Sequence, residues 1–163
     1  MKILLLSDTH GYIDNRILFY AKKADEVWHA GDIGDMSVTD SISSVSSLKA
    51  VYGNIDNNII RMSFPKTLNF KCEGVKIYMT HIKSFYKSKK YDLQKEIDDF
   101  NPDIFISGHS HILKVSHDKK NNLLYMNPGA AGNKGFHKIR TMLKFEITKS
   151  KIENLQVIEL GKR

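Results

Sequence analysis

Residues 3–10 read Ile3-Leu4-Leu5-Leu6-Ser7-Asp8-Thr9-His10, an apolar run followed at once by two side chains that can bind a metal. Four more apolar runs end in the same way. They lead into Asp32, Asn54, His81 and the pair His109 and His111. In open α/β sheets the carboxyl ends of the strands meet at one edge, where ligands bind. The five runs therefore predict one metal centre assembled from distant parts of the chain.

The length of 163 residues fits a single domain spanning 1–163, with enough chain to bury a sizeable core. The apolar run at the start is too short for a signal peptide or a membrane span, so we expect a cytoplasmic protein with no membrane partner. Cys72 is the single cysteine, which excludes an internal disulfide and suits a reducing compartment.

The pattern of apolar residues predicts helices between strands in the first half and strands alone after His111. Helices are expected at 13–24, 37–47 (with Ser37 as N-cap), 57–62 and 88–100. Strands are expected at 2–6, 26–30, 48–52, 67–72, 75–79, 103–107, 112–118, 123–126, 139–148 and 151–160. This order predicts an α/β fold in which two packed sheets carry helices on their outer faces.

Each candidate ligand has a chemical reason. In Asp8-Thr9-His10 an extended backbone would place both ligands on one side, and His109 and His111 repeat the spacing. Asp32 is the candidate bridge between two ions, because a carboxylate has two oxygens, whereas Asn54 offers a neutral oxygen. Together with His81 these make seven ligands, too many for one tetrahedral ion but suited to two.

Imidazole with carboxylate suits Mn, Fe, Zn, Co or Ni better than Ca or Mg, and we expect Mn first. Two divalent ions, Asp8, Asp32 and a bridging hydroxide leave a net charge near +1, which favours an anionic phosphate. Two ions roughly 3.5–4 Å apart can clamp a phosphoryl group and hold the hydroxide in line. His29 is expected only to pack in its strand, and His117 and His137 to lie on the surface.

These motifs, with Asn127-Pro128-Gly129, resemble the calcineurin-like metallophosphoesterases, above all the small YfcE-type phosphodiesterases. The resemblance implies a four-layer αββα sandwich with two mixed sheets flanked by helices. It implies one ion on Asp8, His10, Asp32 and His111 and the other on Asp32, Asn54, His81 and His109. It also implies in-line attack on a phosphodiester by a metal-bridging hydroxide, with Asp8, Asp32, Asn54 and His81 as the catalytic set.

The chain departs from that family at three positions. Ile55 stands where many relatives have a histidine that is proposed to assist the leaving group. Isoleucine cannot donate a proton, so substrates with acidic leaving groups should be favoured, unless another group such as His137 protonates the leaving oxygen. Ile82 replaces a common glycine, and Ala130 replaces a common serine.

Three alternatives remain open at this stage. The same fold serves as a scaffold in the retromer complex, where the resembling subunit lacks some of the ligands. The net charge of +7, with basic clusters at 87–90, 119–120 and 134–140, leaves a metal-dependent nuclease open, although no nucleic-acid motif is present. A phosphomonoesterase would need added cationic contacts, for which Lys83, Lys134 and Arg140 are candidates. Oligomeric state cannot be derived from the sequence.

Overall fold

The computed structural model describes residues 1–82, 93–119 and 122–163. Within these ranges the elements are β1 (Lys2–Leu6), α1 (Asn15–Ala21), β2 (Glu26–His29), α2 (Met36–Ser43), β3 (Ser47–Ala50), α3 (Asn58–Ser63), β4 (Thr67–Cys72), β5 (Val75–Thr80), α4 (Leu93–Phe100), β6 (Ile104–Ile106), β7 (Leu113–Asp118), β8 (Leu123–Pro128), β9 (Ile139–Thr148) and β10 (Lys151–Lys162). None of the helices in the described ranges has the length and apolar composition that a membrane crossing requires.

The strands form two five-stranded sheets, ordered β10-β9-β1-β2-β3 and β4-β5-β6-β8-β7. In the first sheet β1, β2 and β3 are parallel, and β9 and β10 add antiparallel strands. In the second sheet β5, β6 and β8 are parallel, and antiparallel strands lie at both edges. Both sheets are therefore mixed, as the resemblance implied.

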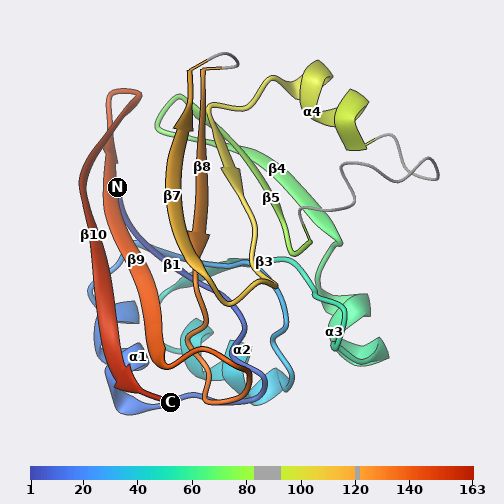
Figure 1. Cartoon of the computed structure of the whole chain (residues 1–163), viewed down its shortest axis with the longest axis vertical. Helices are drawn as coiled ribbons and strands as arrows, with labels where there is room; N and C mark the ends of the chain where they lie inside the picture. Colours follow the sequence, from blue (N-terminus) through green and yellow to red (C-terminus); the bar gives the residue numbers. More distant parts are fainter. Residues whose placement is uncertain (83–92, 120–121) are drawn as a thin grey trace.

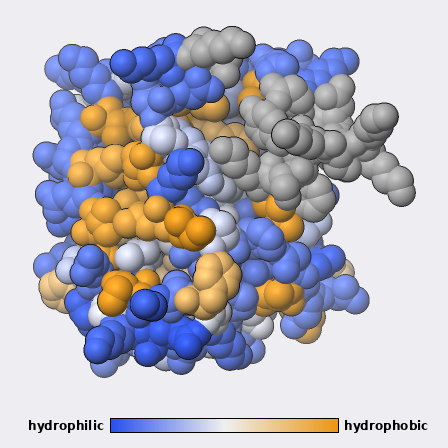
Figure 2. All heavy atoms as spheres, viewed as in Figure 1, coloured by the Kyte–Doolittle hydropathy of each residue, from blue (hydrophilic) through white to orange (hydrophobic). Residues whose placement is uncertain are grey.

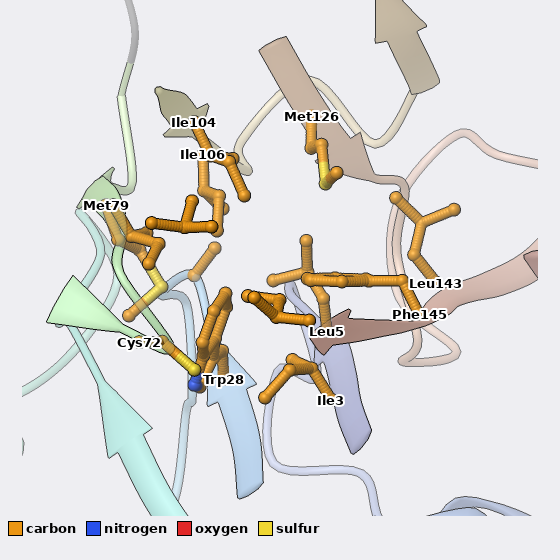
Figure 3. Packing of buried hydrophobic residues seen from close by; sticks show 14 of the residues in the cluster. Ile3, Leu5, Trp28, Cys72, Met79, Ile104, Ile106, Met126, Leu143 and Phe145 are labelled. Atoms are coloured by element: carbon orange, nitrogen blue, oxygen red, sulfur yellow. The ribbon is translucent and has the colours of Figure 1, made fainter. Parts of the chain in front are cut away.

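The two sheets face each other across an apolar core. Side chains alternate along β1, so that Ile3 and Leu5 point between the sheets while Leu4 and Leu6 point the other way. Figure 3 shows Trp28 beside Ile3 and Leu5, with residues of the opposite sheet, among them Met79, Ile104, Ile106 and Met126, approaching from the other side. This apolar layer fixes the two sheets relative to each other.

Helices cover the two outer faces. Ile17 of α1 and Ile42 of α2 are fully buried against the outer face of the first sheet. Ile97 of α4 packs with Tyr78 and Phe105 on the outer face of the second sheet. Figure 1 shows α1 and α2 low in the view and α4 at the upper right, beyond the sheets. The expected four-layer αββα sandwich is therefore confirmed.

Helix boundaries differ from the expected ones. The helix expected at 37–47 is α2, Met36–Ser43, and its N-cap is Asp35, whose side chain accepts a bond from the Ser37 N–H at 2.8 Å. The prediction of Ser37 as cap was therefore wrong, since a carboxylate stands two residues earlier. The first helix is shorter than expected, and residues 88–92 of the expected helix 88–100 lie outside the described residues.

Figure 2 shows apolar side chains gathered between hydrophilic borders on the face where Figure 1 draws β10, β9 and β7. Exposed apolar residues on these strands and on β9 include Val115, Ile139 and Val157. Half-buried Leu113 and Leu155 pack against the core from the same strands. The apolar layer between the sheets thus extends towards the surface along this side.

Candidate metal centre

The candidate ligands follow the carboxyl ends of five strands, β1, β2, β3, β5 and β6, as the sequence predicted. Backbone hydrogen bonds join the loops that carry them. The Asp8 N–H donates to the Gly31 carbonyl at 2.9 Å, and the Gly108 N–H donates to the His81 carbonyl at 3.0 Å. The first bond holds the loop after β1 beside the loop after β2 in the first sheet, and the second holds the loop after β6 beside the loop after β5 in the second sheet.

Six of the seven candidate ligands form two clusters whose donor atoms lie within 4.8 Å of one another. One cluster is Asp8, His10 and His111, and the other is Asp32, His81 and His109. In the first, the His111 Nε2 lies 3.2 Å from Asp8 Oδ1, and the His10 Nε2 lies 3.9 Å from the same oxygen. In the second, the His81 Nε2 lies 3.1 Å from Asp32 Oδ1.

Asp32 faces both clusters. Its Oδ1 lies beside His81, whereas its Oδ2 lies 3.8 Å from the His10 Nε2 in the other cluster. The Ile55 N–H donates to Oδ1 at 3.1 Å and helps to fix the carboxylate plane. This arrangement is the one that a carboxylate shared between two ions would need.

Two buried atoms that could bind a metal ion show whether these residues suit a cation. Among the described residues, Asp8 Oδ1 and His81 Nε2 are buried and have no hydrogen-bond partner. The His81 Nδ1 lies 2.8 Å from the Ala30 carbonyl, which can only accept, so the proton sits on Nδ1 and the Nε2 lone pair of the neutral ring faces Asp32. Ligands about 2.1 Å from one ion lie roughly 3.0–3.4 Å apart. The separations of 3.1 Å between His81 and Asp32 and of 3.2 Å between His111 and Asp8 are therefore compatible with two ligands of one cation.

The carboxylates also control the histidine charge. Burial favours neutral His81, but the adjacent Asp32 and Asp8 outweigh it and raise the pKa of His81. Burial alone would raise the pKa of Asp32, yet the facing His81 ring and the Ile55 N–H lower it overall. The site thus stabilises positive charge between its carboxylates, which is what a bound cation would exploit.

The backbone at the ligands is unusual. Five ligands have left-handed backbones, with φ between 49° and 69°: Asp8, His10, Asp32, His109 and His111. The expectation of an extended Asp-x-His backbone was therefore wrong, although the side chains converge as expected. A left-handed conformation costs a non-glycine residue roughly 1–2 kcal/mol, and such strain gathers at functional sites.

Glycines before the ligands allow ligands from other loops to approach. A Cβ on Gly53 would lie 2.0 Å from Asp32 Oδ1, and one on Gly31 would lie 2.7 Å from the His81 ring. A Cβ on Gly108 would lie 2.9 Å from Asp8 Oδ2. Each glycine that precedes a ligand in the chain is therefore in contact with a ligand from another strand end.

The model of the calcineurin-like phosphoesterase superfamily domain matches residues 1–150. The chain belongs to this superfamily. A probable metallophosphoesterase of Methanocaldococcus jannaschii is 26% identical over 136 residues, which cover 80% of this chain and 68% of that protein. One of Methanothermobacter thermautotrophicus is 22% identical over 135 residues, covering 80% of this chain and 77% of that protein.

Solved structures show the same superfamily fold. Vps29 of Entamoeba histolytica, solved as a complex with Zn²⁺, superposes with a TM-score of 0.77 at 17% identity and covers 98% of this chain and 99% of that one. A predicted phosphoesterase of Streptococcus pneumoniae gives a TM-score of 0.65 at 21% identity, covering 97% of each chain. These similarities establish the fold.

Asn54, the seventh candidate ligand, is exposed. Its backbone lies near Asp32, because a Cβ on Gly53 would lie 2.0 Å from Asp32 Oδ1 and the Ile55 N–H donates to the same oxygen. The sequence did not identify the role of Asp56. Its buried carboxylate accepts bonds from the N–H groups of Ile33, Gly34 and Gly53 at 2.7–3.1 Å. Asp56 therefore ties the loop of Asp32 to the loop of Asn54.

His137 was expected on the surface, and that prediction was wrong. It is only 8% exposed, and its Nδ1 lies 3.2 Å from the His111 Nδ1, while its Nε2 lies 3.0 Å from the Gly132 carbonyl. Burial lowers the pKa of His137 and favours its neutral form. The Phe136 ring stacks on His111 at a centroid distance of 5.3 Å, although Phe136 is 71% exposed. No spacing in the sequence distinguishes His137 from a surface histidine.

The remaining histidines lie where they were predicted, although His29 also forms hydrogen bonds. His29 is fully buried in β2, where its Nε2 lies 2.9 Å from Thr9 Oγ1 and its Nδ1 accepts from the Gly31 N–H at 3.2 Å. Burial lowers the pKa of His29 to about 4. His117 is exposed on β7. Neither belongs to a ligand cluster.

The basic residues that were predicted as candidate phosphate contacts lie in different environments. Arg140 is buried and donates to Asp14 Oδ2 at 2.9 Å and to the Ala131 carbonyl at 2.8 Å, so it supports the fold around the loop that follows β8. Lys134 is exposed, and Lys83 and the lysines at 87–90 lie outside the described residues. Arg140 is therefore a structural residue and not an available phosphate contact.

Proposed function

We propose that this chain is a dinuclear-metal-dependent phosphodiesterase of the small YfcE type, acting on a small-molecule phosphodiester. The observation that carries this proposal is the pair of three-residue clusters with Asp32 between them. Each cluster combines one carboxylate with two imidazoles, and together they offer the donors for two ions. The buried Asp8 Oδ1 and His81 Nε2, which have no hydrogen-bond partner within the described part of the chain, support the same assignment.

The residues divide between two ions. Asp8, His10, Asp32 and His111 would hold one, and Asp32, Asn54, His81 and His109 the other. When bound, such ions supply a hydroxide for attack on phosphorus and stabilise charge on the phosphoryl oxygens. We take Asp8, Asp32, Asn54 and His81 as the catalytic set. The Ala30 carbonyl holds the His81 ring and the Ile55 N–H holds Asp32, so these two members are oriented before substrate arrives.

The net charge of the proposed centre favours a phosphodiester substrate over a phosphomonoester. The protein carboxylates in the centre are Asp8 and Asp32, so two divalent ions and a hydroxide leave a small positive charge that matches a monoanionic diester. A dianionic monoester would need further cations; of the candidates predicted from the sequence, Arg140 is committed to Asp14. Ile55 is 46% exposed beside Asp32 and cannot donate a proton, which favours substrates whose leaving group is already acidic.

We propose Mn²⁺ as the resident ion, because the donors are imidazole and carboxylate without thiolate. The donor set also accommodates Ni, Fe, Co or Zn, and the choice depends on metal supply as well as affinity.

The test is hydrolysis of bis-p-nitrophenyl phosphate by chelator-stripped protein to which Mn, Ni, Co, Zn and Mg are returned separately. We expect turnover to return with a transition metal, to disappear in His81→Ala and Asp32→Ala, and to persist in His117→Ala, which replaces an exposed histidine outside the clusters. Full activity in an Asp32→Ala protein with verified loss of metal would contradict the mechanism. Two bound ions without turnover of any diester would instead favour a scaffold.

A further inference from the structure

A hollow of about 180 Å³ opens directly beside the second ligand cluster. Its lining includes Tyr52, Asn54, Arg61, Lys66, His81 and Ile82. We call this hollow the side pocket. Sites for whole drug-sized ligands measure roughly 300–1,000 Å³. The side pocket is smaller, so it suits one group of a larger molecule.

Arg61 is held in place at this pocket. It lies on α3, and it donates from Nε to the Asp56 carbonyl at 2.7 Å and from Nη2 to the Asn54 carbonyl at 2.9 Å. Its guanidinium also lies 5.2 Å from the Tyr52 ring. A guanidinium has five N–H donors, and these bonds use two of them. Arg61 therefore keeps donors for a ligand while its position is fixed by the loop of a candidate metal ligand.

The electrostatic environment of the side pocket is positive. Lys66 contributes a second cation from the segment between α3 and β4, and no aspartate or glutamate is found among the described residues that line the pocket. Arginine and lysine together are the usual partners of a phosphate group, since arginine offers two parallel donors and lysine a compact charge. The pocket is thus suited to a small anion with several oxygens.

We propose that the side pocket binds a phosphate group that the substrate carries next to its scissile phosphodiester. The inference rests on the proposed function, because Asn54 and His81 belong both to the pocket wall and to the candidate metal centre. A phosphodiester held at the metals would therefore have one of its substituents directed over Asn54 and His81 towards Arg61 and Lys66. The substrate class becomes a phosphodiester with an additional terminal phosphate.

The test uses equilibrium binding to the Mn²⁺-loaded protein at fixed salt, measured by calorimetry with two matched ligand pairs. Thymidine 3′,5′-bisphosphate is compared with thymidine 5′-monophosphate, and methylenediphosphonate with methylphosphonate, so that a long and a short spacing are both sampled. We expect at least one ligand with two anionic groups to bind roughly tenfold more tightly than its partner. Lys66→Gln should remove most of that tenfold difference. Lys71→Gln, at an exposed position of β4 outside the pocket, should preserve it.

Arg61→Gln should have the same effect as Lys66→Gln, but Arg61 also holds the loop of Asn54, so the metal content of each variant must be verified before binding is compared. Equal affinities within both pairs would overturn the proposal. So would a preference that Lys66→Gln and Arg61→Gln leave unchanged.

A separate measurement distinguishes a substrate group from free phosphate. Inorganic phosphate is titrated into the metal-stripped protein and followed by ³¹P NMR. Lys66-dependent binding of free phosphate, together with equal affinities within both ligand pairs, would identify a site for the free ion and overturn the substrate assignment. Because every readout is binding, failure of the protein to hydrolyse any diester would contradict only the proposed function.

Discussion

The His137 Nδ1 lies 3.2 Å from the His111 Nδ1, on the side of His111 that faces away from the other candidate ligands. The His137 Nε2 faces the Gly132 carbonyl at 3.0 Å and must carry a proton, since a carbonyl can only accept. The Nδ1 of neutral His137 is then an acceptor, so His111 holds its own proton on Nδ1. These two hydrogen bonds fix the tautomer of His111, so that its Nε2 lone pair lies on the side of Asp8 and is available to a metal ion.

We therefore expect His137→Ala to weaken metal binding at the cluster of Asp8, His10 and His111 by roughly 10–100-fold. The ring of His111 would lose the partner that fixes its orientation and its protonated nitrogen. The measurement is competition with a chelator of known affinity, with metal content determined by mass spectrometry. His117→Ala is the matched control because His117 is exposed on β7. Equal metal affinity in both variants would show that His137 does not position His111.

The layers of the fold and the convergence of the ligands could be predicted from the sequence, because both depend on periodicity. The alternation of Ile3 and Leu5 with Leu4 and Leu6 assigns β1 a face in each of two apolar layers. The neighbouring parallel strands β1 and β2 place their carboxyl ends at the same edge, and so Asp8 and Asp32 were expected to meet. His81 follows β5 of the other sheet and reaches Asp32 across the two sheets.

The residues that orient the ligands could not be predicted in this way. His137 reaches His111 through a loop of irregular backbone, and Asp56 acts by accepting bonds from N–H groups on two separate loops. Such contacts depend on loop geometry, which has no sequence period. The left-handed φ of Asp8 and His10 was missed for the same reason, since it arises where several loops pack together and not from a local propensity.

Gly53→Ala should disrupt the centre although it removes no ligand. The new Cβ would lie 2.0 Å from Asp32 Oδ1 and 2.3 Å from the Asp32 backbone nitrogen, so the shared carboxylate must move. We expect loss of stoichiometric metal binding and of turnover with the fold retained by circular dichroism. Gly161→Ala is the control, because its φ of 99° brings backbone strain but its nearest neighbour is the flexible Arg16 at 3.5 Å. Full metal content in Gly53→Ala would contradict the close approach.

His29 should make the metal-stripped protein sensitive to mild acid. Burial lowers the pKa of His29 to about 4, against 6.5 for an exposed histidine. Between these values the unfolded chain binds a proton that the folded chain does not, so stability falls as the pH drops from 6.5 towards 4. The full shift corresponds to roughly 3 kcal/mol of unfolding free energy. Urea denaturation at pH 7 and pH 4.5 should show a smaller loss in His29→Gln than in the unchanged protein, and parallel losses would disprove the assignment.

Arg140 should matter for stability and not for substrate binding. It is 5% exposed, its Nε donates to the Ala131 carbonyl, its Nη2 donates to Asp14, and it lies 4.6 Å from the Tyr12 ring. Arg140→Met keeps the apolar stem but leaves a buried carbonyl and a partly buried carboxylate without their donor, which should cost about 2–3 kcal/mol. Lys144→Met, an exposed change on the same strand, should cost far less. Urea denaturation measures both. The opposite result would be an Arg140→Met protein that is as stable as the unchanged chain but has a raised KM for bis-p-nitrophenyl phosphate at full metal content. That result would show that Arg140 contacts the phosphate.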